Sequence, residues 1–155
     1  MTLRTERPGA RRCEVTESPS PSSDYADAFE VTVDETDART AEEVVRTGLS
    51  RVAPERFSAL ILAHRHILGF RLGPASSQDH VMGWRVVMSE PGVCRLEADG
   101  PLMGGTMVAR RVDPVTMRLT TFVRYRQPLA RLVWAIAGPI HRRAAPQLME
   151  LSATP

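Results

Sequence analysis

The chain has 155 residues, 43% of them hydrophobic, and a formal net charge of +2 at pH 7. This length and composition predict a single globular domain with one hydrophobic core, and they exclude a second domain of ordinary size. The basic residues form no recognisable motif, so a nucleic-acid partner is not expected despite a pI near 8.9.

The first 23 residues differ in composition from the rest of the chain. Residues 1–23 are rich in Pro, Ser and charged residues, and such a segment buries too little apolar surface to offset its ordering entropy. We therefore expect a disordered tail over residues 1–23 and one domain over residues 24–152.

No apolar run is long enough for a secretory signal or a membrane span, and Cys13 and Cys94 lack the spacing of a metal site. These features favour a cytoplasmic protein without membrane insertion.

Three regular elements follow this tail. Alternating apolar residues over 24–33 predict a strand, and the acidic, Thr-containing stretch after it predicts a helix from about Thr40 to Val52. Pro54 then opens a second short helix, whose apolar residues recur at helical spacing until Gly69. One strand is thus followed by two short helices.

The periodicity changes to two after the loop 71–80, which predicts an antiparallel meander with one buried face. Four strands are expected, unless the loop itself contains another. The residues expected on the inner face are Met82, Trp84, Val86, Met88, Cys94, Leu96, Ala98, Met103, Met107, Ala109, Met117, Leu119, Thr121, Val123 and Tyr125. Gly104 and Gly105 predict a bulge or a bend, because glycine curves a strand rather than pairing well in a flat one.

The last element is a long helix that begins at Pro128, where the missing N–H costs nothing. Pro139 removes one backbone hydrogen bond and predicts a kink just after Ala137. The stripe expected to lie on the sheet consists of Leu129, Leu132, Val133, Ile136, Ile140, Ala144 and Leu148. The predicted fold class is α+β: a curved antiparallel sheet wrapped around a long, kinked C-terminal helix, with two short helices after the first strand.

This order of elements resembles the helix-grip domains of the START-like superfamily, also written SRPBCC. Within that group, the segments "PGVCRLEADGPLMGGTMVAR" and "LTTFVRYRQPLARLVWAIAGPIHRRAAPQLME" look like a bacterial domain family of unknown function that is also found fused to short-chain-dehydrogenase-like proteins. The resemblance covers roughly Tyr25 to Leu151. It implies an apolar cavity between the sheet and the long helix, but no particular activity, because one fold carries many functions.

This implied cavity gives the candidate site. Its expected occupant is a small hydrophobic molecule, oriented by the polar tips of Trp84, Thr121 and Tyr125, and neither a cofactor nor a metal is expected. The candidate ligand-binding residues are Trp84, Met82, Met103, Met107, Met117, Thr121, Tyr125, Val133, Ile136 and Ile140. All of them also suit an ordinary core, and both interpretations stay open. His141, just beyond Pro139, lies either at the cavity mouth or on a solvated helix face.

Two other functions are compatible with the sequence. A cyclase- or isomerase-like enzyme would act on a hydrophobic substrate in the same cavity, with Tyr125 or His64 moving a proton. A protein-interaction module would lack the cavity and use the outer sheet face around Phe122, where an exposed aromatic residue suits a homodimer. The arginines expected on that face, among them Arg124 and Arg126, alternate with acids and favour a solvated surface. Motifs of nucleotide binding, serine hydrolysis and zinc proteolysis do not occur.

Overall fold

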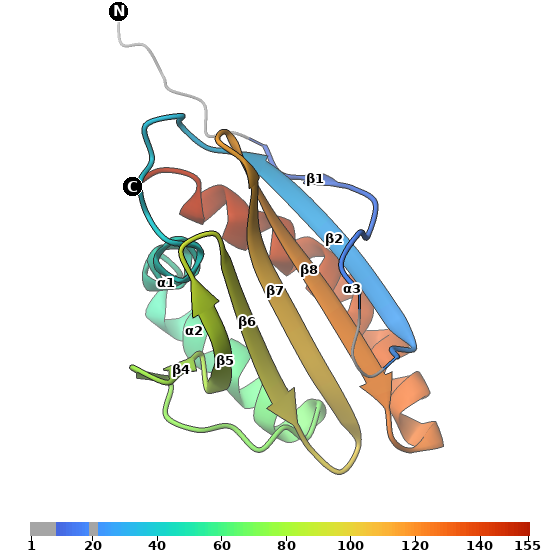
Figure 1. Cartoon of the computed structure of the whole chain (residues 1–155). Helices are drawn as coiled ribbons and strands as arrows, with labels where there is room; N and C mark the ends of the chain where they lie inside the picture. The colour runs from blue at the N-terminus through green and yellow to red at the C-terminus, as the bar shows by residue number, and fades with distance from the viewer. Residues whose placement is uncertain (1–8, 19–21) are drawn as a thin grey trace, which may run out of the picture.

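The computed structural model describes residues 9–18 and 22–155, which form an α+β fold (Figure 1). The strands are β1 (Arg11–Arg12), β2 (Tyr25–Thr32), β3 (Ser76–Ser77), β4 (His80–Val81), β5 (Trp84–Glu90), β6 (Val93–Asp99), β7 (Met103–Asp113) and β8 (Thr116–Tyr125). The helices are α1 (Ala41–Ser50), α2 (Pro54–Leu62), the π-helical turn η1 (Ala63–Ile67) and α3 (Pro128–Ser152).

All eight strands belong to one curved antiparallel sheet, in the order β1-β2-β8-β7-β6-β5-β4-β3. The helices lie together on one face of this sheet, and α3 crosses behind β7 and β8 (Figure 1). We call the face covered by the helices the inner face and the opposite one the outer face. No helix in the described part of the chain combines the length and the apolar character needed to cross a membrane.

The two short helices form where the sequence predicts them. Thr40 caps α1 through a reciprocal pair of hydrogen bonds: its hydroxyl accepts from the Glu43 N–H at 3.2 Å, and the Glu43 carboxylate accepts from the Thr40 N–H at 2.8 Å. Pro54 stands in the first turn of α2. The second helix ends in the π-helical turn η1, which the periodicity does not reveal.

The stretch 71–80, predicted as a loop, contains the short hairpin of β3 and β4 at the edge of the sheet. Six strands rather than four therefore follow the helices. β3 and β4 are each only two residues long, which is too short for an alternation of apolar and polar residues to be recognised in the sequence.

The inner-face prediction is confirmed for the apolar residues other than Met88, since they pack in the main core. The prediction for Met88 is wrong. The pairing of β5 with β6 shifts between Val86 and Met88, and a bulge of this kind moves the next side chain to the opposite face. Met88 instead packs on the outer face beside Val93 and Phe122.

The bulge predicted at Gly104 and Gly105 is absent, since both residues pair in unbroken register with β6 and β8. The β7–β8 register shifts farther along, between Arg111 and Asp113. Gly105 serves a different purpose: a Cβ there would lie 2.6 Å from an atom of the Trp84 ring. The absence of a side chain at Gly105 leaves the space that the Trp84 ring occupies.

The N-terminal segment differs from the predicted tail over residues 9–18. Arg11–Arg12 pair with β2, and Val15 packs on an outer apolar patch formed by Val93, Val108 and Phe122. Phe122 is consequently 4% exposed, so the exposed aromatic contact expected there does not exist. The rest of the expected tail includes residues 1–8 and 19–21, which lie outside the described residues.

Helix α3 packs on the sheet with a face that matches the predicted one only in part: Val133 and Leu148 pack beside the core. The buried residues are Ala130, Trp134, Gly138, Ala145, Met149 and Ser152. Leu129, Leu132, Ile136 and Ile140 are exposed. The small residues of the buried face allow close approach, as at Gly48 of α1, where a Cβ would lie 2.8 Å from the Ser152 Cβ. The helix contains Pro139 and Pro146 without interruption.

Candidate ligand site between the sheet and α3

A row of side chains crosses the inner face of the sheet near the middle of its long strands. Asp27 of β2 is paired with Thr121 of β8, and Thr121 is paired with Met107 of β7. Directly opposed residues of antiparallel strands share one face, so a carboxylate, a hydroxyl and a thioether lie next to one another. Asp27 and Thr121 are 1% and 2% exposed, so these polar groups are enclosed beneath the helices.

Asp27 obtains its partners from its own strand and from α3. Its carboxylate accepts a 2.5 Å hydrogen bond from the Tyr25 hydroxyl and lies 3.1 Å from Nε2 of His141. A buried carboxylate is costly without such partners. A carboxylate only accepts hydrogen bonds, so Nε2 of His141 is the donor in its contact with Asp27.

Two further residues of α3 complete this group. Arg142 donates to the Tyr25 hydroxyl at 3.2 Å and lies over the Tyr25 ring. Trp134 contacts the edge of the Tyr25 ring at 5.1 Å between centroids and the His141 ring at 5.5 Å. We call these residues, Tyr25, Asp27, Trp134, His141 and Arg142, the Asp27 cluster.

Burial raises the pKa of the Tyr25 phenol, and its hydrogen bond to Asp27 raises the pKa further. The phenol therefore keeps its proton at neutral pH and remains a donor to the carboxylate. Tyr25 thus fixes one oxygen of Asp27 while His141 meets the same carboxylate from the helix.

A second group lies toward the other side of the inner face. His64 of η1, Phe70 and Trp84 contact one another, with ring centroids 5.7 Å apart for His64 and Trp84 and 5.2 Å apart for Phe70 and Trp84. We call these three residues the His64 cluster. Trp84 reaches over Gly105, which belongs to the same strand as Met107, so the two clusters flank the central strands of the sheet.

The pKa of His64 is lowered to about 4, mainly by burial and to a smaller extent by the nearby His141. The imidazole is therefore neutral at pH 7. π-Helical turns are rare and often mark functional sites, and η1 is the turn that holds this ring in the interior.

Four polar atoms of this interior have no hydrogen-bond partner within the described chain. They are Nδ1 of His64, Nε1 of Trp84, Oγ1 of Thr121 and Nε1 of Trp134, and all four are shielded from solvent. An unsatisfied buried donor or acceptor costs about 1–3 kcal/mol. The inner face therefore presents unmatched hydrogen-bonding groups among its apolar core residues and beside the Asp27 cluster.

The structure brings together most of the predicted ligand-binding residues. Met82, Trp84, Met103, Met117 and Thr121 are buried, and Met107, Tyr125 and Val133 are partly buried beside the same core. The prediction is wrong for Ile136 and Ile140. Both side chains are 67% exposed on the side of α3 that faces away from the sheet, because the helix is rotated relative to the predicted stripe.

Sequence reasoning missed Asp27, Tyr25 and Trp134 as site residues. A signal existed for Asp27, because it alternates with Phe29 and Val31 along β2 and so belongs to the inward set. His141 was expected at a cavity mouth or in solvent, and it lies against Asp27 instead. No group of three or more metal-binding side chains occurs within residues 9–18 and 22–155.

Comparison of the chain with known protein families finds no match, and comparison with curated proteins finds none either.

Proposed function

We propose that the chain is a helix-grip domain of the START-like superfamily and that it binds a small, largely apolar molecule between the sheet and α3. The order of elements supports the fold: β2, the helices α1 and α2, six antiparallel strands and a long helix across the inner face. The chemistry of that face supports the position proposed for the ligand.

The observation that carries the proposal is the set of four unmatched polar atoms. The indole N–H groups of Trp84 and Trp134 can only donate hydrogen bonds, so a ligand that pairs with them must supply an acceptor. Thr121 and the neutral His64 can donate or accept. A molecule with one or two carbonyl or hydroxyl oxygens on an apolar body satisfies these groups while contacting the methionines around them.

The methionines suit such an occupant. Met103 and Met117 are fully buried on the inner face, and Met107 lies beside Thr121. Unbranched thioether side chains rearrange at low cost and adapt to ligands of irregular shape. This adaptability lets the interior open around a guest molecule.

The route of entry runs past α2. No residue of α2 is buried, and Phe57, Leu60 and Ile61 only partly cover the core. An element with so little buried surface opens at low cost in free energy. Movement of α2 and η1 would uncover the His64 cluster first.

The test combines native mass spectrometry with a neutral apolar fluorophore, N-phenyl-1-naphthylamine. We expect a molecule to co-purify from the natural host, and we expect saturable binding of the fluorophore with energy transfer from Trp84 and Trp134. Thr121→Val keeps the volume of the side chain but removes the hydroxyl. It should therefore weaken the binding of the co-purified molecule by about tenfold, while the fluorophore still binds.

Ile136→Ala is the matched control, because Ile136 is exposed on the far side of α3. It should leave both kinds of binding unchanged. The absence of a co-purified molecule together with the absence of saturable fluorophore binding would rule out an interior ligand site.

A second candidate function is proton transfer on the bound molecule, as in a cyclase or isomerase. The observation that favours it is His141, which Asp27 orients at 3.1 Å. A carboxylate that holds an imidazole leaves the other ring nitrogen available as a base. This pair is a better candidate than His64 or Tyr125, because neither the His64 imidazole nor the Tyr125 hydroxyl is hydrogen-bonded to a carboxylate among the described residues.

Deuterium exchange separates the two functions. The released ligand is incubated in D₂O with the wild-type protein or with His141→Gln, and its mass is measured. A gain of deuterium with the wild type only would identify His141 as the base. Binding without any gain of mass would leave a pure binding protein.

A further inference from the structure

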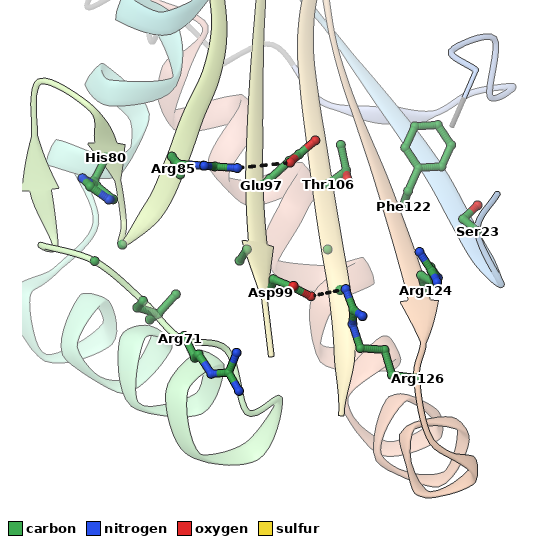
Figure 2. Close-up of a pocket in the computed structure, with 16 residues that line it drawn as sticks. Ser23, Arg71, His80, Arg85, Glu97, Asp99, Thr106, Phe122, Arg124 and Arg126 are labelled. Carbon is green, nitrogen blue, oxygen red and sulfur yellow. Dashed lines mark ion pairs between the residues drawn. The ribbon is translucent and has the colours of Figure 1, made fainter. Parts of the chain in front are cut away.

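The outer face of the sheet contains an open hollow of about 480 Å³ (Figure 2). Arg71 and His80 approach it from the loop and hairpin beside β5, Glu97 and Asp99 project from β6, and Arg124 lies at its other side on β8. The sheet separates this hollow from the Asp27 and His64 clusters, so the two regions do not overlap.

The hollow exists because a glycine forms part of its floor. Gly104 is paired with Asp99 on one side and with Arg124 on the other. A Cβ at Gly104 would lie 3.3 Å from Oδ1 of Asp99 and 3.8 Å from Nη2 of Arg126. A larger side chain would therefore project among the charged groups and fill the space between them.

The charges around the hollow do not balance. Its lining includes four arginines, Arg71, Arg85, Arg124 and Arg126, and two carboxylates, Glu97 and Asp99, so the arginines exceed the acids by 4 − 2 = 2. Both carboxylates are already engaged: Asp99 lies 2.6 Å from Arg126, and Glu97 lies 3.8 Å from Arg85.

Arg71 and Arg124 are the two lining arginines without an acidic partner in the described part of the chain. Arg71 is held in place by its backbone, whose N–H donates to the Asp99 carbonyl at 2.8 Å. Arg124 belongs to β8, two residues before Arg126, and Asp99 is already paired with Arg126. Each remaining guanidinium offers a planar fork of donors that matches an oxyanion.

We propose that this hollow binds a small organic anion through its phosphate or carboxylate oxygens, with Arg71 and Arg124 as the principal donors. Its concave shape and volume suit a small molecule. The surplus positive charge lies within one hollow, which suits a small anion better than the continuous phosphate backbone of a nucleic acid.

Inorganic pyrophosphate is the first probe, because its separated charges can bridge two guanidinium groups, and citrate is its carboxylate counterpart. Binding is measured by isothermal titration calorimetry at low ionic strength. We expect saturable binding of pyrophosphate or citrate, or of both, to the wild-type protein. The anion with the lower Kd shows whether the site prefers phosphate or carboxylate oxygens. Binding of neither would overturn the proposal.

Arg71→Gln and Arg124→Gln should each weaken binding by about tenfold or more, since each removes a charge-assisted hydrogen bond. Gly104→Val should abolish binding without changing any charge. Arg143→Gln, an exposed arginine of α3, is the matched control and should leave binding unchanged. Equal weakening by Arg143→Gln and Arg124→Gln would show attraction to net charge alone and would overturn the site.

Binding of N-phenyl-1-naphthylamine in the same variants separates this site from the interior one. Gly104→Val faces the hollow on the outer face and should leave fluorophore binding intact. A variant that loses the anion but keeps the fluorophore has remained folded, so its result refers to the hollow itself.

Discussion

The Asp27 carboxylate lies 3.1 Å from Nε2 of His141, a residue 114 positions away in the chain, and this contact joins β2 to α3. This contact fixes the rotation of α3 about its axis, because His141 must face the sheet. The same rotation brings Trp134 inward and turns Ile136 outward.

We expect Asp27→Ala to lower the free energy of unfolding by about 1–3 kcal/mol, because it leaves the partly buried His141 and Tyr25 without their acceptor. Urea unfolding measures this loss. Glu35→Ala removes an exposed carboxylate and should change the stability by less than about 0.5 kcal/mol. In a double-mutant cycle, the combined loss from Asp27→Ala and His141→Ala should be less than the sum of the single losses; full additivity would contradict the contact.

Much of the fold follows from the sequence because each element has its own periodicity. The period of two over β6, β7 and β8 places Cys94, Leu96 and Leu119 correctly on the inner face. The caps at Thr40 and Pro54 locate the short helices. These are local signals, and neighbouring strands in a meander pair without long-range information.

The rotation of α3 could not be predicted from its hydrophobicity. The helix has one stripe of large apolar residues, including Leu132 and Ile136, and one of mainly small residues around Trp134 and Gly138. Hydrophobicity favours the first stripe, whereas close packing favours the second, because small side chains let the helix approach the sheet and α1. The His141–Asp27 contact adds a preference that only the assembled fold reveals.

The two faces of α3 give a direct prediction. Trp134→Ala should destabilise the fold by about 3–5 kcal/mol, as expected for a buried aromatic residue, whereas Ile136→Ala should cost less than about 0.5 kcal/mol. Thermal or urea unfolding of the two variants makes the comparison. Similar losses in both variants would mean that the exposed stripe is covered in solution.

Stability should depend on pH through His64. Its pKa is about 4 in the folded chain against an ordinary value of 6.5, so between these values the unfolded chain binds a proton that the folded chain does not. The free energy of unfolding should therefore fall as the pH is lowered from about 7 to about 4, by at most roughly 3 kcal/mol.

Urea unfolding over this pH range tests the dependence on His64. His64→Gln cannot titrate and should show a shallower decline, whereas His66→Gln, at an exposed position, should behave like the wild type. The same decline in His64→Gln and in the wild type would assign the effect to other groups.

The N-terminal segment should act as a cover for the outer apolar patch. Val15 packs beside Phe122, and Glu17 and Thr16 bind Arg110 and Arg118 of the neighbouring strands. This packing could not be predicted from the sequence, because a single valine among Pro, Ser and charged residues gives no periodic hydrophobic pattern. The interaction surface expected around Phe122 is therefore available only when the segment is displaced.

Val15→Asp should lower the free energy of unfolding by about 1–2 kcal/mol, since it removes a partly buried apolar side chain and brings a charge next to Phe122. It should also promote self-association, which sedimentation velocity detects, because the uncovered patch can bind a second copy. Glu14→Ala changes an exposed neighbour and should do neither. A Val15→Asp variant as stable and as monomeric as Glu14→Ala would show that the segment does not hold the patch closed, because loss of a real cover must either destabilise the sheet or expose its apolar surface.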